Sequence, residues 1–87
     1  MVMWDVRYTS QAVKDIPRLQ SAKLDGKAKE LIAVIQANPF QAPPPCEKLQ
    51  GYASRYSRRI NRQHRLVYEV DAEQKRIKIL RMWTHYE

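Results

Sequence analysis

One stretch of the sequence predicts the centre of the fold: residues 56–68, which read YSRRINRQHRLVY. Two runs that suit β-strands flank the polar residues 61–63, and three residues are a common length for a hairpin loop. With that loop, Ile60 faces His64 and Arg59 faces Arg65. Directly opposed side chains lie about 4.5–5.5 Å apart at Cβ, so two like charges there repel each other. The stretch therefore predicts a hairpin whose arginines serve something other than stability.

A second hairpin is expected to follow, with residues 71–75 as its loop. The same counting places Arg65 opposite Arg81, so that Arg59, Arg65 and Arg81 form a row across three strands. A register slip of one residue would move a side chain to the other face of the sheet. Guanidinium groups present planar donor forks that suit phosphate oxygens. We interpret the row as a phosphate-binding surface; the alternative is that these arginines only point into solvent.

The bulk composition favours a polyanionic partner. The chain has 87 residues, with 16 Lys plus Arg against 9 Asp plus Glu, a formal net charge of +7 and a pI near 9.9. Such an excess favours nucleic acid, with a membrane surface or an acidic protein as alternatives. We expect one domain over residues 1–87, long enough for a modest core. Cys46 is the single cysteine, and no apolar run reaches the roughly 18 residues of a membrane span, so a soluble cytoplasmic protein is expected.

Hydrophobic spacing predicts the other elements. Residues 3–8 alternate as a half-buried strand does. Apolar residues recur at helical spacing over residues 10–21, where Pro17 is expected to kink or restart the helix, and over residues 23–37. A proline-rich connector follows over residues 39–45. The chain then ends in a meander of three strands, over residues 52–60, 64–70 and 76–83.

The two faces of this meander differ in character. The even-numbered face is expected to form the core with Tyr56, Ile60, Leu66, Tyr68, Val70, Leu80 and Met82. The odd-numbered face carries Arg55, Arg59, Arg65, Glu69 and Arg81, and continues to Trp83 and His85. The predicted fold class is α+β, with two N-terminal helices packed on a twisted antiparallel sheet of about four strands in the order β-α-α-β-β-β.

The residues that suit chemistry are an acid–base pair and several cations. Two glycines are too few for a glycine-rich phosphate loop, and no Cys/His set has zinc spacing. Glu47 suits a general base and His85 a general acid, although both also suit ordinary surface positions; His64 suits a structural role. In RNA, a base takes the 2′-hydroxyl proton, an acid protonates the departing 5′-oxygen, and cations stabilise the phosphorane charge. This reaction requires no metal, so we expect no cofactor.

Four segments together resemble a known family: PCEKL at 45–49, YSRRI at 56–60, HRLVY at 64–68 and HY at 85–86. They are similar to the Txe/YoeB branch of the RelE superfamily, the toxins of bacterial toxin–antitoxin pairs. The resemblance implies a microbial-RNase-like, RelE-like fold and a ribosome-dependent mRNA endonuclease that cuts in the A site and inhibits translation. It also implies neutralisation by an acidic segment of an antitoxin of the YefM/Axe type, and a homodimer as a further expectation.

The resemblance also assigns roles by position. Glu47 matches the family's general base, His85 its general acid and Arg65 the arginine that stabilises the transition state. Arg59 matches an arginine that holds the phosphate, and Tyr86 matches the terminal tyrosine that orients the substrate.

Three further residues are expected to bind RNA or phosphate: Lys48, Arg58 and Arg81. Lys48 substitutes for a lysine that some family members carry where this chain has Gln50. Tyr56 replaces a Trp that is frequent in the family, and the chain continues to Glu87 beyond the tyrosine.

Two other function classes stay open. A non-catalytic basic RNA-binding module would keep the arginines but has no use for Glu47 and His85 in one cleft. A toxin of the ParE type, which poisons DNA gyrase through protein contacts, shares the order of elements but not the Glu and terminal His-Tyr set. A discrete cut in a translated mRNA distinguishes the endonuclease from both.

Overall fold

The order of elements follows the predicted one, with an extra short strand. The computed structural model describes residues 3–43, 45–51 and 54–85, with the backbone alone for residues 84 and 85. The elements are β1 (Asp5–Tyr8), α1 (Ser10–Ser21), α2 (Asp25–Ala37), β2 (Glu47–Lys48), β3 (Arg55–Arg59), β4 (His64–Asp71) and β5 (Arg76–His85). Among the described residues, no helix has the length and apolar character needed to cross a membrane.

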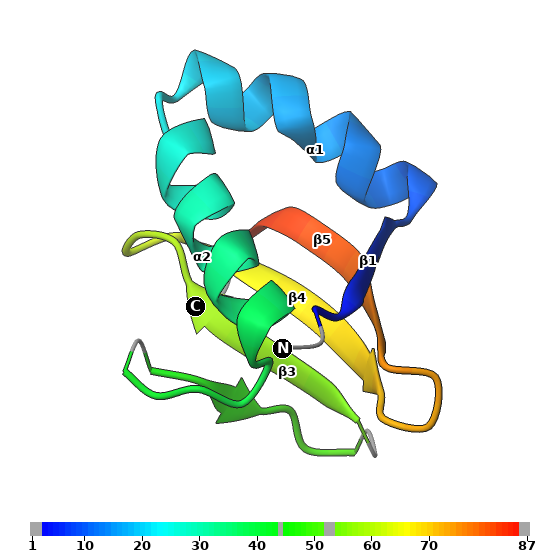
Figure 1. The fold of residues 1–87 in the computed structure, drawn as a ribbon. Coiled ribbons are helices and arrows are strands. Elements are labelled where there is room, and N and C mark those ends of the chain that lie inside the picture. Colours follow the sequence, from blue (N-terminus) through cyan, green and yellow to red (C-terminus); the bar gives the residue numbers. More distant parts are fainter. Residues whose placement is uncertain (1–2, 44, 52–53, 86–87) are drawn as a thin grey trace.

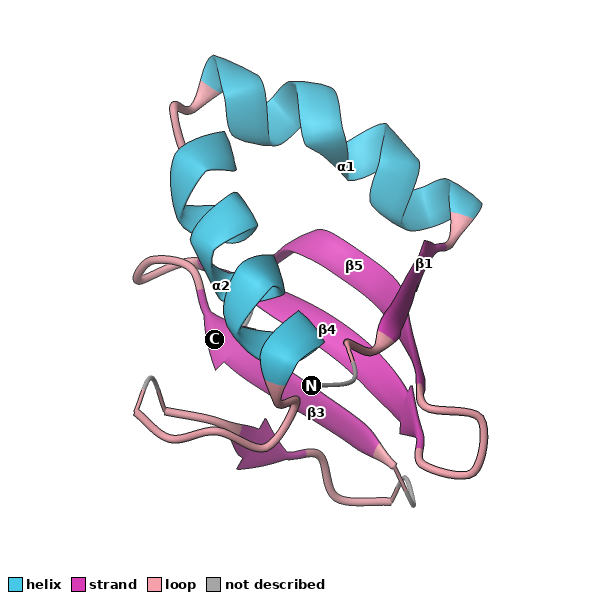
Figure 2. Cartoon of the chain, viewed as in Figure 1, coloured by secondary structure: helices cyan, strands magenta, loops and turns pink. Residues whose placement is uncertain are grey.

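The strands form one sheet in the order β1-β5-β4-β3-β2 (Figure 2). Both helices lie on the same face of it (Figure 1), which confirms the predicted α+β class. The prediction of a wholly antiparallel sheet is wrong: the sheet is mixed, because β1 runs parallel to β5, with Asp5 opposite Arg76. β2 adds a strand to the predicted sheet, because the two residues that follow the proline-rich connector and Cys46 pair with β3, with Glu47 opposite Ser57.

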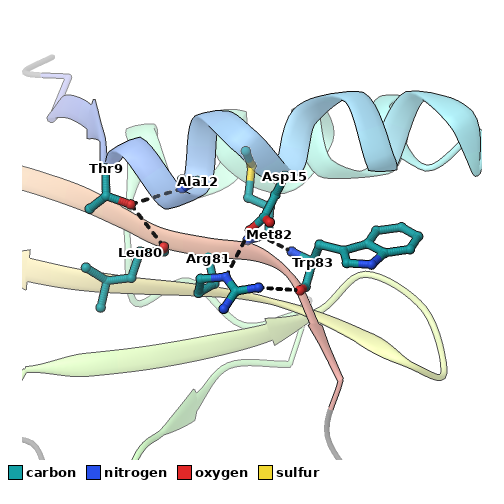
Figure 3. Close-up of polar contacts among 7 residues, drawn as sticks. All are labelled: Thr9, Ala12, Asp15, Leu80, Arg81, Met82 and Trp83. Carbon is teal, nitrogen blue, oxygen red and sulfur yellow. Dashed lines mark hydrogen bonds and ion pairs between the residues drawn. The ribbon is translucent and has the colours of Figure 1, made fainter.

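Local contacts and backbone conformation determine where the two helices begin. Thr9 caps α1: its Oγ1 accepts a hydrogen bond from the backbone N–H of Ala12 at 3.1 Å and donates one to the carbonyl oxygen of Leu80 at 3.0 Å (Figure 3). The cap therefore also attaches the helix to β5. The predicted span 10–21 is confirmed as one helix, and the restart offered as one outcome at Pro17 does not occur, because Pro17 lies inside α1 without ending it. The second helix begins two residues later than predicted, because Lys23 adopts a positive φ of 60°.

The register of β5 corrects the predicted row of arginines. Arg65 lies opposite Thr84, and Tyr68 lies opposite Ile79, so four residues of β4 face six of β5. Irregularities on both sides of Val67 take up the difference. Arg81 consequently lies opposite Val67 instead of Arg65, and the predicted row is wrong.

The residues of β5 that form the core also differ from the predicted ones. The second hairpin begins with Asp71 opposite Arg76, one residue away from the predicted pairing, so Ile77 and Ile79 are fully buried at odd positions. The irregularities beside Val67 then shift the alternation again, and Met82 is buried at an even position. Leu80, predicted as a core residue, is only half-buried and lies outside the buried cluster. The even-numbered core is confirmed on β4, where Leu66, Tyr68 and Val70 are buried.

A buried carboxylate on α1 holds the irregular part of β5. Asp15 is 0% exposed, and its Oδ2 accepts hydrogen bonds from the backbone N–H groups of Met82 at 2.9 Å and Trp83 at 3.2 Å (Figure 3). The same oxygen accepts a hydrogen bond from Nε of Arg81 at 3.1 Å. Two consecutive backbone N–H groups do not both point along a regular strand ladder. Asp15 therefore supplies the acceptor that the distorted strand needs.

We predict that Asp15→Ala lowers the free energy of unfolding by about 3 kcal/mol, because it leaves two backbone donors and one guanidinium without their buried acceptor. Urea denaturation measures this loss. Glu30→Ala is the control: it removes an exposed carboxylate that lies 4.0 Å from Lys27, and it should cost less than about 0.5 kcal/mol. A loss below about 1 kcal/mol for Asp15→Ala would contradict the role given to this carboxylate.

Candidate functional site

A pocket of about 540 Å³ opens beside the turn between β3 and β4. Four basic side chains and one acidic side chain line it, from α2, β2, β3, the turn and β4: Lys27, Arg59, Arg62, Arg65 and Glu47. Ser57 and Asn61 contribute polar groups to the same wall. The pocket is strongly basic and is larger than one phosphate group requires.

Glu47 and Arg65 meet in this pocket, as the sequence predicted. Nη1 of Arg65 lies 2.9 Å from Oε2 of Glu47 and donates a longer hydrogen bond of 3.5 Å to Oγ of Ser57. Pairing between β2 and β3 places Glu47 opposite Ser57 and so brings the carboxylate within reach of β4. The Glu47 side chain is 65% exposed, whereas that of Arg65 is 20% exposed. A substrate can therefore reach the carboxylate while the guanidinium is held against the sheet.

The predicted register of the first hairpin is confirmed. Arg59 lies opposite Arg65, and the backbone N–H of Ile60 donates to the carbonyl oxygen of His64 at 2.9 Å. Oδ1 of Asn61 accepts hydrogen bonds from the backbone N–H groups of Gln63 at 2.9 Å and His64 at 2.8 Å. This turn is therefore fixed by its own side chain. Two guanidinium groups face each other across the strands, an arrangement that an anion between them would stabilise.

His85 ends β5 at the same end of the sheet as the pocket. Its backbone lies opposite His64, next to the pair formed by Arg65 and Thr84. The His85 side chain and all of Tyr86 lie outside what the structure describes, so their predicted roles stay predictions. His64 itself is buried and stacks on the Trp83 ring at a centroid distance of 3.8 Å, in agreement with the structural role expected for it.

Arg58 corrects a prediction, because it does not reach the pocket. It is 1% exposed, and its Nε donates to the hydroxyl of Tyr68 at 3.1 Å. Its Nη2 donates to the carbonyl oxygen of Pro39 at 3.1 Å, and the Tyr68 hydroxyl donates to the same oxygen at 2.7 Å. Sγ of Cys46 lies 3.3 Å from the Tyr68 hydroxyl. This buried cluster, made of Arg58, Tyr68, Pro39 and Cys46, holds both ends of the connector that leads to Glu47.

Two other predicted phosphate ligands lie outside the residues that line the pocket. Arg81 is engaged with Asp15 on the helix side and also donates from Nη2 to the carbonyl oxygen of Trp83 at 2.9 Å. Lys48 follows Glu47 on β2, is exposed and lies opposite Tyr56. Sequence reasoning missed Lys27 and Arg62, both of which line the pocket. Among the described residues, no three His, Cys, Asp or Glu side chains gather as a metal ion would require.

The environment of Tyr68 keeps its hydroxyl protonated. Burial raises the pKa of Tyr68 far above its ordinary value, and the contact with Cys46 raises the pKa further. Arg58 partly opposes both effects, because its positive charge and its hydrogen bond favour the phenolate. The hydroxyl therefore remains a hydrogen-bond donor to Pro39 through moderately alkaline pH.

We predict that Tyr68→Phe lowers the free energy of unfolding by about 1–3 kcal/mol at neutral pH, since it removes a buried partner of Arg58 and Pro39. The folded-state pKa of Tyr68 lies above that of the unfolded chain, so its contribution is present below pH ~10 and is lost as the pH rises further. Urea denaturation between neutral pH and pH ~11 should show the difference between wild type and variant shrinking at high pH.

Tyr8→Phe is the matched control, because Tyr8 is exposed. Its stability should follow that of the wild type across the whole pH range. The difference in the free energy of unfolding between wild type and Tyr68→Phe could also stay constant above pH ~10. That result would contradict the raised pKa given to the Tyr68 hydroxyl.

Known proteins are similar to this chain in sequence and in fold. A family model described as the YoeB-like toxin of bacterial type II toxin-antitoxin system matches residues 8–86. The YoeB dimer from Staphylococcus aureus is 35% identical at a TM-score of 0.82, over 97% of this chain and 99% of that one. The YoeB-YefM complex from Staphylococcus aureus gives 36% identity and a TM-score of 0.78, over 95% and 98% of the two chains. The YoeB/ParE toxin from Agrobacterium tumefaciens gives 29% and 0.83, over 94% and 99%. No curated protein matches the chain.

Proposed function

The chain belongs to the YoeB-like toxins of bacterial type II toxin–antitoxin systems, and on that basis we propose that it is a ribosome-dependent endoribonuclease that cuts mRNA in the A site. It would act in the cytoplasm, where it inhibits translation. The observation that supports this proposal best is the Glu47 carboxylate, held 2.9 Å from Arg65 in a pocket whose other charged side chains are basic. A carboxylate in such a pocket suits proton removal next to a bound phosphate.

The reaction begins with proton transfer to Glu47. The carboxylate takes the proton of a 2′-hydroxyl, and the 2′-oxygen then forms a bond to the adjacent phosphorus. A guanidinium has five N–H donors, so Arg65 is able to donate hydrogen bonds to the phosphate oxygens and to the Glu47 carboxylate at the same time. As negative charge builds up on those oxygens, Arg65 stabilises it, and Arg59 on the facing strand adds a second guanidinium.

The reaction ends with protonation of the leaving group. His85 gives a proton to the 5′-oxygen as its bond to phosphorus breaks, which leaves a 2′,3′-cyclic phosphate on one fragment and a 5′-hydroxyl on the other. Tyr86 would orient the nucleotide. These two roles rest on the resemblance to the family and on the place of β5, whose last residues lie beside Arg65 and His64.

A cognate antitoxin is the partner that the comparisons suggest. A Staphylococcus aureus relative of 36% identity was solved as a YoeB-YefM complex, and another of 35% identity as a YoeB dimer. We propose that an antitoxin of the YefM type neutralises this chain through an acidic segment that the net charge of +7 attracts. We propose a homodimer as a second form of assembly.

We predict that expression of the wild type arrests growth and leaves cuts at A-site codons, which primer extension on a translated mRNA maps. Glu47→Gln keeps the shape and a hydrogen-bond acceptor for Arg65 but removes the base, and it should slow cleavage by about 10²–10⁴-fold. Arg65→Ala and His85→Ala should fall in the same range. Arg55→Ala is the control, because Arg55 pairs with Glu69 at 3.2 Å outside the pocket.

The other function classes give different results in the same experiment. An RNA-binding module would slow translation without a discrete cut. A toxin of the ParE type would inhibit gyrase and leave the mRNA intact. Equal toxicity of the wild type and the variants at Glu47, Arg65 and His85 would remove the proposed mechanism.

A further inference from the structure

Two basic side chains of the pocket, Lys27 and Arg62, take no part in the reaction described above. We infer that they bind a second phosphate of the RNA backbone, adjacent to the phosphate that Arg65 holds. The inference relies on the proposed function for the identity of the ligand as RNA. The site would then recognise a stretch of RNA chain with at least two phosphates.

The two side chains come from separate parts of the molecule but reach the same pocket. Lys27 lies near the start of α2, and Arg62 is the middle residue of the turn between β3 and β4. Both are exposed, and both line the pocket together with Glu47 and Arg65. A ligand that extends beyond the Glu47–Arg65 pair along this wall meets these two cations.

The turn that carries Arg62 is fixed before any ligand binds. Oδ1 of Asn61 accepts hydrogen bonds from the backbone N–H groups of Gln63 at 2.9 Å and His64 at 2.8 Å. These bonds close the turn on both sides of Arg62. Binding therefore needs to order the Arg62 side chain but not its backbone, which lowers the entropic cost.

Charge and volume both exceed what one phosphate requires. Glu47 offsets one of the four cations, so the pocket keeps a net excess of positive charge. Its volume of about 540 Å³ lies within the roughly 300–1,000 Å³ of pockets that hold drug-sized ligands. The ion pair between Lys27 and Glu30 is 4.0 Å long and exposed, and such pairs contribute about 0–1 kcal/mol. A phosphate can therefore compete with Glu30 for the Lys27 ammonium.

The experiment uses an RNA octanucleotide with 2′-O-methyl groups, which binds but is not cut because its 2′-oxygens are blocked. Its affinity is measured over a series of salt concentrations for the wild type, Lys27→Ala, Arg62→Ala and Lys29→Ala. The matched control is Lys29, which is exposed on the same helix but lines an apolar groove between α1 and α2. Thermal unfolding checks that each variant is folded.

We expect Lys27→Ala and Arg62→Ala each to weaken binding several-fold at low salt. Each should also reduce the slope of log K against log salt, and the double variant Lys27→Ala/Arg62→Ala should reduce it by about 0.7, the value for one phosphate contact on a single strand. Arg62→Lys keeps the charge and should restore the slope. Lys29→Ala should bind as the wild type does, because its side chain faces another groove.

Slopes for Lys27→Ala and Arg62→Ala that equal those of the wild type and Lys29→Ala would overturn the inference. It would also be overturned if the two substitutions weakened binding of an acidic peptide and left RNA binding unchanged, since the surface would then be a protein interface. Failure of the proposed function has a different signature. Translated mRNA would stay uncut by the wild type while the octanucleotide still showed both losses, and the second phosphate site would stand.

Discussion

The buried carboxylate of Asp15 is the contact on which the second half of the sheet depends. A charge that is fully removed from water destabilises the fold unless hydrogen bonds surround it. Here three donors from the consecutive residues 81–83 of β5 meet one oxygen. Thr9 holds the start of the same helix against Leu80. Helix α1 is thus attached to β5 at two points, and the second is the place where the strand leaves its regular register on the way to His85.

A second buried polar cluster performs the same task for the opposite side of the site. Arg58 and Tyr68 both donate to the carbonyl oxygen of Pro39, and Cys46 contacts the Tyr68 hydroxyl. The connector is therefore held at its two ends, and Glu47 follows directly after the second end. The Glu47–Arg65 pair itself is largely exposed at the carboxylate, so it contributes little to stability. The residues that hold the site in place are distinct from those that would react.

The sequence was sufficient for the parts of the fold that short-range rules determine. The hairpin register was predictable because a loop of three residues fixes it, and it led directly to the pair of Arg59 and Arg65. The register of β5 was not predictable in the same way. The loop before it is one residue shorter than expected, and the extra residues farther along the strand lie against an acceptor 66 residues earlier in the chain. A signal for Asp15 was present: it lies three residues after Ala12 and four before Leu19, on the buried face of the helix.

The same contrast between local and long-range effects explains why only part of the candidate site was predicted. Strand alternation placed position 58 on the core side, yet the guanidinium suggested a phosphate ligand, and alternation proved the better guide. Lys27 was not identifiable, because no local pattern tells which lysine of an exposed helix face comes close to a distant turn.

Glu47 lies at the sheet edge, so the geometry of the candidate site can change without unfolding the domain. β2 has two residues and pairs with β3 alone, so opening it breaks few contacts and leaves the core intact. Segments of this kind open locally at a much lower free energy than the whole domain. Calorimetric melting therefore does not report a local change at this edge. A variant with an unchanged melting temperature can still have lost the position of the Glu47 carboxylate next to Arg65.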